Sequence, residues 1–271
     1  MSIVIILIIG LFIGSFLGVL INRLPRNEDF IKGHSHCEFC KKDLKAIDLI
    51  PVLSFVSTKG KCRYCHKALP YFYPIIEIST GILFALVYIF SIPNFQFIIS
   101  NELLIPQFLI TLIYHLIIVA GFIIIFFIDL KEGIILDKIL LPLIIIIATY
   151  LLIINPQSLI INLVCGLIAF LFFLVIALSF KFIRGKEGMG GGDVKLAFVL
   201  GLFLGFPNII LALYIAFLTG AAVGIILILW KKKNLKSTSL PFGPFLLFGT
   251  LVCLFFGNQI LPKILPLIGL Q

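Results

Sequence analysis

Eight long apolar runs, separated by short polar segments, constrain this chain more than any other feature. The hydrocarbon core of a bilayer is about 30 Å thick, so a helix needs about 20 mainly apolar residues to cross it. Hydrophobic residues make up 61% of the 271 residues and charged residues 12%, whereas soluble domains are roughly 45–50% apolar and about 25% charged. We therefore expect an all-α polytopic membrane protein with about eight transmembrane helices. The runs cover residues 3–22, 75–92, 107–128, 134–154, 159–180, 194–206, 209–229 and 240–257.

The distribution of Lys and Arg predicts the orientation of these helices, because cytoplasmic loops carry an excess of both residues. If the N-terminus is outside, the cytoplasmic segments contain 20 of the 21 Lys and Arg residues, and only Lys263 lies elsewhere. We therefore expect both termini outside, and we expect no nucleic-acid partner despite the net charge of +9. The first run has no Lys or Arg before Gly14, so we expect a retained helix and not a signal peptide. The cytoplasmic segments are 23–74, 129–138, 181–195 and 230–239.

Only one polar segment is long enough to form a small domain. It is basic and rich in Cys and His. The sequence therefore predicts three parts: a first transmembrane helix (1–23), a cytoplasmic four-cysteine zinc-binding domain (24–74) and a seven-helix membrane domain (75–271). We expect no internal repeat.

Four cysteines in this polar segment form two CxxC pairs, Cys37 with Cys40 and Cys62 with Cys65. Two such pairs complete a tetrahedral thiolate shell for zinc. Stable disulfides are rare in the reducing cytosol, so a structural zinc ion is favoured over disulfides. A neighbouring histidine is a less favoured replacement for one thiolate; the candidates are His34, His36 and His66. The other two cysteines lie singly in apolar runs, which is typical of small buried hydrophobic residues.

A glycine-rich stretch precedes Asp193. Five glycines occur within residues 185–192, so we expect no stable helix there and expect Asp193 where the next helix begins. The apolar run 194–206 would be only about 20 Å long as a helix, which predicts that Asp193 dips into the membrane. An ionisable residue at that depth indicates a functional site. The alternative is a flexible loop with a helix-capping aspartate.

Asp129 is the candidate partner of Asp193, because it ends an apolar run on the same predicted face. Two carboxylates that share a site cannot both ionise easily, so one keeps a proton. The ionised carboxylate can activate water while the protonated one polarises an amide carbonyl, which is sufficient to hydrolyse a peptide bond. The alternative is an isolated carboxylate at the level of the lipid headgroups.

Six segments carry a resemblance to a known family. They are GSFLGVLINRLP (14–25), the CxxC pairs flanking DLIPVLSF (48–55), YPIIEISTG (73–81), FIDLKEGIILD (127–137), GKEGMGGGDVKL (185–196) and LPFGPFLLFG (240–249). In this order they resemble the bacterial type IV prepilin peptidases, a family of GxGD-type intramembrane aspartic proteases. The glycine–aspartate segment is the most specific of the six. One departure is Gly18, where many members of the family have Asn.

The resemblance implies a function as well as a fold. Asp129 and Asp193 would be the catalytic pair of an enzyme in the bacterial cytoplasmic membrane. Its substrates would be type IV prepilin or pseudopilin precursors, which lose a short basic leader at the cytoplasmic face. Many family members also methylate the new N-terminus with S-adenosylmethionine, and Glu77 is a candidate for the methyl-donor site. The alternative, slightly favoured, is that Glu77 is an ion-paired or hydrogen-bonded structural group.

A basic leader meeting a basic protein face needs local acidic groups. We expect the carboxylates around the two catalytic segments to receive the leader, and the glycines before Asp193 to let its backbone approach; the alternative for the carboxylates is ordinary solvated charge. These substrate-binding candidates are Glu132, Asp137, Glu187, Gly190, Gly191 and Gly192.

Two rival functions are open at this point. A presenilin-like protease would share the glycine-rich aspartate, but the double CxxC segment does not belong to that pattern. A non-enzymatic, zinc-bearing membrane scaffold or transporter of pilus or secretion machinery would not need the two carboxylates.

Overall fold

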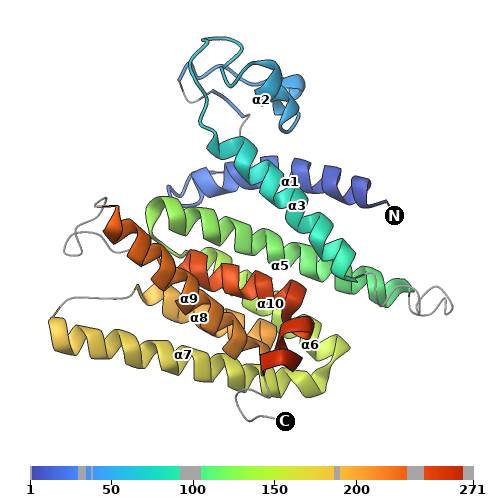
Figure 1. Ribbon diagram of the computed structural model, residues 1–271. Helices are drawn as coiled ribbons and strands as arrows, with labels where there is room; N and C mark the ends of the chain where they lie inside the picture. The colour runs from blue at the N-terminus through green and yellow to red at the C-terminus, as the bar shows by residue number, and fades with distance from the viewer. Residues whose placement is uncertain are drawn as a thin grey trace. The chain divides into compact units, whose positions relative to one another are not determined.

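The computed structural model describes residues 2–29, 35–37, 39–91, 105–185, 190–230 and 241–264. Within these ranges the regular secondary structure is helical, with isolated β-bridges and no strand (Figure 1). The predicted all-α fold is therefore confirmed. The helices are α1 (Ile3–Arg23), η1 (Ala46–Leu49), α2 (Leu53–Ser57), α3 (Phe72–Ser91), α5 (Ile105–Glu132), α6 (Asp137–Ile154), α7 (Pro156–Arg184), α8 (Gly191–Leu204), α9 (Asn208–Leu229) and α10 (Gly243–Ile264).

Seven of the described helices are long and apolar enough to cross a membrane: α1, α3, α5, α6, α7, α9 and α10. Each coincides with a predicted apolar run, so the multi-pass membrane class is confirmed. The remaining run forms α8, which has 14 residues. At about 1.5 Å per residue it is roughly 21 Å long, shorter than a hydrocarbon core of about 30 Å.

The chain divides into two compact units, Met1–Ile124 and Ile125–Gln271, and the boundary falls inside α5. In unit 1, α1 and α3 pack along each other in antiparallel directions. A Cβ added to Gly10 would lie 2.8 Å from the Cα of Gly81, and one added to Gly14 would lie 2.7 Å from the Cα of Glu77. Such backbone-to-backbone packing is common between membrane helices that carry small residues at their contact.

Gly18 continues this α1–α3 contact one turn further along α1. Its missing side chain leaves room for the ring of Tyr73, whose Cδ1 would lie 3.5 Å from an added Cβ. Asn22, on the next turn of α1, donates a hydrogen bond from Nδ2 to the Tyr73 hydroxyl at 3.1 Å. The departure at Gly18 therefore accommodates a tyrosine between the two helices.

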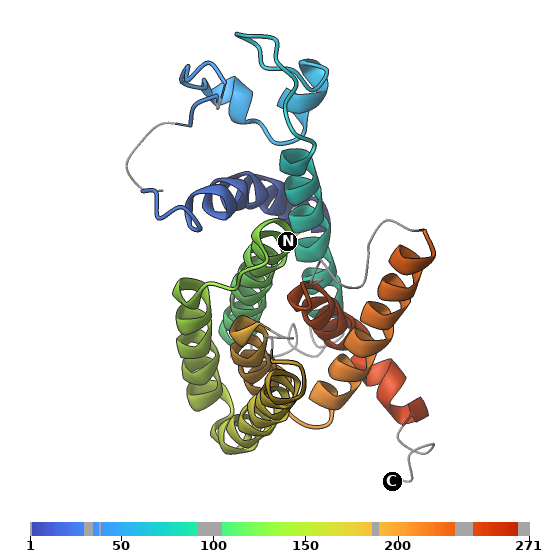
Figure 2. The ribbon, with the colours of Figure 1, turned by 90° about the vertical axis from the view of Figure 1, so that its left-hand side faces the viewer.

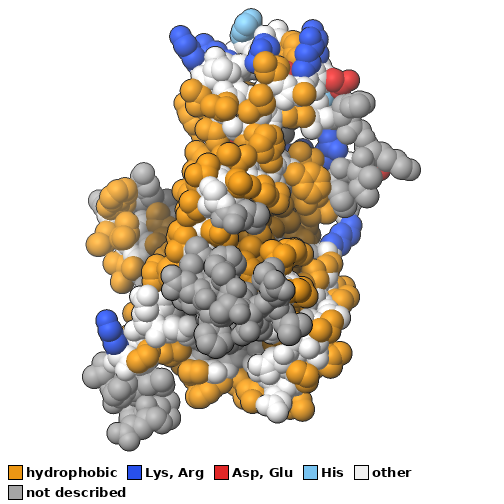
Figure 3. All heavy atoms as spheres, turned by 90° about the vertical axis from the view of Figure 1, so that its right-hand side faces the viewer, with side chains coloured by type: hydrophobic (Ala, Val, Ile, Leu, Met, Phe, Trp, Pro, Cys, Tyr) orange, Lys and Arg blue, Asp and Glu red, His pale blue; other side chains and the backbone are white. Residues whose placement is uncertain are grey.

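The segment that precedes α3 extends beyond the N-terminal end of that helix (Figure 2). It contains η1 and α2 and otherwise consists of turns and irregular backbone. Its basic side chains gather at its far end, whereas hydrophobic side chains cover most of the visible helical surface (Figure 3). This contrast is the one expected between a polar segment and lipid-facing helices.

In unit 2, α8 packs against α6, α7, α9 and α10. A helix that is hydrophobic all round is stable only when neighbours surround it, and α8 is the shortest helix of this unit. Its closest neighbour is α7, because a Cβ on Gly201 would lie 2.7 Å from the Cα of Gly166. The buried residues of α8 are Asp193, Val194, Leu196, Ala197, Val199, Leu200, Gly201 and Leu202.

We predict that Gly201→Ala destabilises the protein by about 1–3 kcal/mol, because the added methyl group overpacks the α7–α8 contact. Thermal unfolding in one detergent, followed by circular dichroism, measures the effect. Gly224→Ala in α9 is the matched control, since nothing lies within 4 Å of a Cβ at that position. Equal melting temperatures for the two variants would contradict the prediction.

Candidate active site and metal centre

Asp129 and Asp193 are both buried within unit 2. Asp129 lies in the last turn of α5 and is 4% exposed, while Asp193 lies in the first turn of α8 and is 8% exposed. The two carboxylates are close enough for their charges to repel each other. The structure thus brings together the pair of carboxylates that the sequence pattern singled out.

Backbone N–H groups at helix starts face these carboxylates. The N–H of Gly243, the first residue of α10, interacts with both Asp129 and Asp193, and the N–H of Gly190 interacts with Asp193. The N-terminus of a helix carries a partial positive charge that stabilises a nearby anion. Two helix starts therefore offset part of the cost of burying the two carboxylates.

Each aspartate also keeps one oxygen without a hydrogen-bond partner among the described residues. These atoms are Asp129 Oδ2 and Asp193 Oδ1, and both are shielded from solvent. A buried polar atom without a partner costs free energy, and such atoms mark sites where water, a proton or a ligand is received. Both carboxylates therefore have an oxygen available for chemistry.

Two residues that the sequence reasoning missed complete this site. A Cβ on Gly243 would collide with Asp129 Oδ2, so any larger residue there would displace the Asp129 carboxylate. Ile135, in the link between α5 and α6, packs onto the start of α8, where a Cβ on Gly192 would lie 2.8 Å from the Ile135 Cβ. The sequence feature that could have pointed to Gly243 is its position before Pro244, because proline favours the first turn of a helix and so marks a helix start there.

The expectation that residues 185–192 hold no stable helix is wrong for its last two glycines. Gly191 and Gly192 form the first turn of α8, and Gly190 takes the position before the helix. Asp193 donates its backbone N–H to the carbonyl of Gly190 at 3.1 Å. Packing of α8 within unit 2 outweighs the low helix propensity of glycine, which is worth only about 1 kcal/mol per residue. Gly185 ends α7 with a φ of 63°, as glycine often does.

The acidic candidates for leader binding are only partly described. Asp137, at the start of α6, forms an ion pair with Lys195 at 2.8 Å. Glu132 lies 3.7 Å from the Lys131 ammonium group. Glu187 is outside the described residues. The two described carboxylates are therefore solvent-accessible and already have cations beside them.

The four CxxC thiols lie together in unit 1. The sulfur atoms of Cys37, Cys40, Cys62 and Cys65 are all within 4.8 Å of one another, and the Cys37 and Cys65 sulfurs are 3.9 Å apart. Tetrahedral zinc with Zn–S bonds of about 2.3 Å separates its sulfurs by roughly 3.8 Å. This group could hold a metal ion, and no histidine of the described residues belongs to it.

The backbone around Cys62 is arranged for a thiolate. Desolvation by burial raises its pKa, but hydrogen bonds from the backbone N–H groups of Cys65 and Tyr64 outweigh it and lower the pKa of the Cys62 thiol to about 7. Metal binding requires the deprotonated form of each thiol. The Cys62 thiol is therefore deprotonated more easily, whereas the pKa of the Cys65 thiol in the same turn is raised to about 11.

The expectation of no internal repeat is wrong for this segment. Cys37 donates its N–H to the carbonyl of Lys42 at 3.0 Å, and Cys62 donates its N–H to the carbonyl of Lys67 at 2.9 Å. An isolated bridge flanks each turn, His36 with Asp43 and Lys61 with Ala68. The signal was present in the sequence, since HCEFCKKDL (36–44) and KCRYCHKAL (61–69) share their Cys, Lys and Leu positions.

Side chains of the two turns also contact each other reciprocally. The Lys42 ammonium group lies 4.6 Å from the ring centre of Tyr64, and the Lys67 ammonium group lies 5.1 Å from the ring centre of Phe39. Each is a cation–π contact, worth about 0.5–1 kcal/mol at an exposed site. The lysine of each turn therefore covers the aromatic residue inside the other CxxC pair.

Asp48 ties η1 to the second turn, a role that the sequence did not reveal. Its carboxylate pairs with Arg63 Nε at 2.8 Å and accepts a hydrogen bond from the Tyr64 hydroxyl at 2.8 Å. The bond to Asp48 raises the pKa of the Tyr64 phenol. Asp48 also accepts the backbone N–H of Lys45 at 3.1 Å. The loop between the CxxC pairs is thereby fastened to the metal-binding turns.

Glu77 occupies the second turn of α3 and is 9% exposed. Its Oε2 accepts a hydrogen bond from the backbone N–H of Val52 at 2.7 Å. Val52 has a φ of 60°, which is a rare and strained value for a β-branched residue. Glu77 therefore holds the start of α2 in place.

The fold and these sites define a class of protein: a multi-pass membrane protein with two buried, adjacent carboxylates and a separate cluster of four thiols. Comparisons with known proteins identify the family. Residues 8–91 match the bacterial peptidase A24 N-terminal domain, and residues 116–225 match the type IV leader peptidase family. No solved structure matches the chain.

Curated relatives cover nearly the whole chain. A protein of Bacillus subtilis (strain 168) is 33% identical over 265 residues, which is 95% of either chain. A protein of Aeromonas salmonicida (strain A449) is 30% identical, and the match covers 93% of this chain and 89% of the relative. A protein of Burkholderia pseudomallei (strain 1026b) is 28% identical, and the match covers 93% of this chain and 84% of the relative. All three are named prepilin leader peptidase/N-methyltransferase. The chain belongs to the type IV leader peptidase family, and it is an enzyme.

Proposed function

We propose that this chain is an aspartic endopeptidase in which Asp129 and Asp193 are the catalytic pair. The observation that carries this proposal is the pair of adjacent buried carboxylates, each with one oxygen lacking a partner among the described residues. No described Lys, Arg or His forms an ion pair with either aspartate. The pair is therefore not a structural salt bridge.

The mechanism follows from this environment. Two adjacent carboxylates of low exposure share one proton, because the repulsion between two negative charges opposes double ionisation. The ionised aspartate takes a proton from the attacking water, and the protonated aspartate donates its proton toward the carbonyl oxygen of the scissile bond. The N–H of Gly243 remains as a fixed dipole beside both groups, which supports the charge that moves between them.

Asp129→Asn and Asp193→Asn should each abolish cleavage of a prepilin-like precursor, with a loss of more than about 1,000-fold, while the fold is kept. Asparagine preserves the shape of aspartate but cannot act as an acid or a base. Mass spectrometry of the product measures leader removal, and the melting temperature verifies folding. Asp43→Asn, an exposed position in unit 1, is the control. Cleavage by both catalytic variants would refute the aspartic mechanism.

The proposed substrates are type IV prepilin or pseudopilin precursors, as the names of the relatives suggest. The leader would be cut at the cytoplasmic face of the bacterial inner membrane, with both termini of the enzyme outside. The excess of Lys and Arg in the proposed cytoplasmic segments supports this orientation. The family assignment disfavours the scaffold or transporter alternative.

We propose that Glu132, Asp137 and Glu187 receive the basic leader and that Gly190, Gly191 and Gly192 admit its backbone. A leader cation at Asp137 would compete with Lys195, which already pairs with that carboxylate. A solvated ion pair of this kind contributes about 0–1 kcal/mol. Exchange of Lys195 for a substrate cation is therefore inexpensive in free energy.

Glu132→Lys combined with Glu187→Lys should raise KM about 10-fold and leave kcat nearly unchanged, because the charges attract the leader and do not take part in bond cleavage. Steady-state kinetics with a synthetic precursor measures both constants. The same variant should show wild-type KM with a precursor whose leader lysines are replaced by glutamine. An equal increase of KM for both precursors would disprove leader recognition by charge.

We propose that the four CxxC thiols hold one structural zinc ion. All four positions of a tetrahedral ion would be taken by protein ligands, so the metal would fold the segment and would not activate water. A segment of about 50 residues has little core of its own, and the buried residues of this one include Cys37 and Cys62 themselves.

Purified protein should contain one zinc ion per chain, and Cys62→Ser should reduce the zinc content by more than half. Loss of one thiolate weakens the site, and the unfolded segment becomes accessible to proteases. Elemental analysis measures the metal, and limited proteolysis measures the accessibility. Cys253→Ser is the control, because Cys253 lies in α10 outside the thiol cluster. Unchanged zinc in Cys62→Ser would exclude this site.

We propose further that the enzyme methylates the new N-terminus with S-adenosylmethionine, as the names of the relatives suggest. The methyl donor supplies an electrophilic methyl group on a cationic sulfur. Glu77 is the proposed contact to this cofactor, and its burial in the second turn of α3 supports the proposal.

A further inference from the structure

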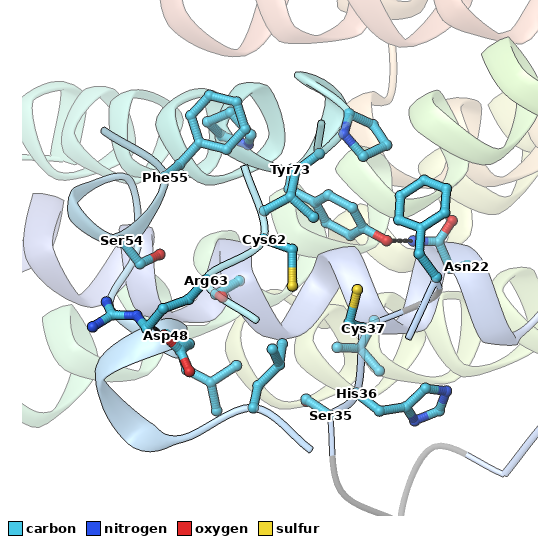
Figure 4. A pocket seen from close by; sticks show the side chains of 18 of the residues that line it. Asn22, Ser35, His36, Cys37, Asp48, Ser54, Phe55, Cys62, Arg63 and Tyr73 are labelled. Atoms are coloured by element: carbon cyan, nitrogen blue, oxygen red, sulfur yellow. Dashed lines mark hydrogen bonds and ion pairs between the residues drawn. The ribbon is translucent and has the colours of Figure 1, made fainter. Parts of the chain in front are cut away.

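The short helix α2 turns two apolar side chains outward. Leu53 and Val56 are three residues apart and so share one face of the helix, and they are 67% and 64% exposed. Ser54 and Phe55 lie on the opposite face, where they line a cavity of ≈ 490 Å³ within unit 1 (Figure 4). A helix at a boundary between protein and water turns its apolar face inward. The outer face of α2 therefore suits surroundings other than water.

Other exposed apolar side chains lie on the neighbouring elements. The helix η1 packs against α2 and exposes Ile47. Tyr71 directly precedes α3, and its ring centre lies 5.5 Å from that of Phe55, yet most of its surface is exposed. Exposed apolar residues gathered in this way mark contacts with another protein or with a membrane.

A hydrogen bond places α2 at the level of the membrane boundary. The spanning part of α3, Phe72–Phe90, has 19 residues. It is about 28 Å long, so nearly all of it is needed to cross a hydrocarbon core of about 30 Å. Glu77, in the second turn of α3, accepts the backbone N–H of Val52, the residue before α2, at 2.7 Å. The helix α2 thus begins beside the first two turns of a membrane helix, where headgroups meet acyl chains.

The polar groups of α2 have partners within the protein. The hydroxyls of Ser57 and Thr58 both donate to the carbonyl oxygen of Ser54 at 2.9 Å. In hydrocarbon, backbone polar groups have to be satisfied by the protein itself, and α2 with the turn after it meets this requirement. The backbone N–H groups that donate to carbonyl oxygens of residues 50–56 are those of Ser54, Val56, Thr58, Lys59 and Gly60.

Lysines flank this pair of helices. Lys45 directly precedes η1 and Lys59 follows α2, and both are exposed. The one carboxylate between them in the sequence, Asp48, is paired with Arg63. Anionic lipids attract lysines near the membrane surface, and tyrosine is enriched at the level of the headgroups. An apolar face flanked by lysines and lying beside a membrane helix fits a lipid surface better than a second protein.

We propose that α2 and η1 lie in the membrane surface beside α3. Leu53 and Val56 insert at the boundary between headgroups and acyl chains, and Lys45 and Lys59 contact anionic headgroups. The segment with the four thiols is then held against the bilayer through α2, while its basic end projects into water (Figure 3). This inference concerns a lipid-binding surface and does not depend on the proposed peptidase or methyltransferase activity.

Fluorescence quenching by lipids measures this contact directly. The chain has a single tryptophan, so Trp230→Phe provides a background in which Val56→Trp introduces the only indole ring. The purified full-length protein is placed in nanodiscs, one chain per disc, made of phosphatidylglycerol and phosphatidylcholine with or without bromine on the upper part of the acyl chains. We expect the emission of the Val56→Trp variant to fall by about half or more in brominated discs, because bromine quenches an indole that it touches and an interfacial helix lies at that depth. Leu53→Trp in the same background should give the same result, so the test does not depend on one substitution.

Asp43→Trp in the same background is the matched control, because Asp43 is an exposed, charged position of the same segment. Its emission should be the same in both kinds of disc and should be quenched by acrylamide dissolved in the water. The melting temperature of each variant verifies that the fold is kept.

The outcomes separate lipid from the other possible occupants of this face. If brominated lipids quench neither Val56→Trp nor Leu53→Trp and acrylamide quenches both, the face is in water and the inference is wrong. If acrylamide is excluded only in vesicles that hold many copies, or only after a precursor is added, another protein chain covers the face and the inference is also wrong. Equal quenching of Asp43→Trp by brominated lipids would mean that the whole segment collapses onto the bilayer, which contradicts a specific role of α2. Quenching confined to the two α2 positions supports the inference.

Discussion

The burial of two carboxylates side by side is the constraint on which the site in unit 2 depends. In a medium of low polarity such a pair is tolerated only if a proton is shared and fixed dipoles compensate the remaining charge. Here the compensation comes from the starts of α8 and α10, through the N–H groups of Gly190 and Gly243. Because these donors belong to the backbone, the chain has to approach the carboxylates directly. A side chain at Gly243 would occupy the place of Asp129 Oδ2.

The length of α8 serves the same purpose. A helix of full membrane length would place its first turn in the headgroup region, where water screens charges. With 14 residues, α8 packs against longer helices, and Asp193 and Val194 in its first turn are buried, whereas Gly191 is exposed. The close contact with α7 through Gly166 and Gly201 keeps this short helix surrounded on its way through the unit. The short, closely packed α8 therefore determines both the packing of unit 2 and the buried environment of Asp193.

Much of this arrangement could be predicted from the sequence, because membrane helices have a strong local signal. Apolar runs predicted the helices, CxxC spacing predicted the thiol cluster, and the glycine-rich stretch indicated Asp193 as a functional residue. Contacts without such a signal were missed. Gly243 lies far from both aspartates along the chain, and Ile135 has no polar group that would mark it. Only tertiary packing brings these two residues to the site. In the sequence, Asp48 does not differ from an ordinary loop carboxylate. Its contacts with Arg63 and Tyr64 are visible only in the structure.

The division of the chain supports a division of chemistry. All residues of the proposed peptidase site belong to unit 2, whereas the thiols, Glu77 and the cavity belong to unit 1. The two family matches follow nearly the same division, with residues 8–91 in unit 1 and residues 116–225 mostly in unit 2. The boundary lies inside α5, not in a loop, so the two units share a continuous helix. Peptide cleavage needs a shared proton in an apolar setting, while methyl transfer needs a site for a large polar cofactor. The proposed catalytic pair and the proposed contact to the methyl donor therefore lie in different units of the chain.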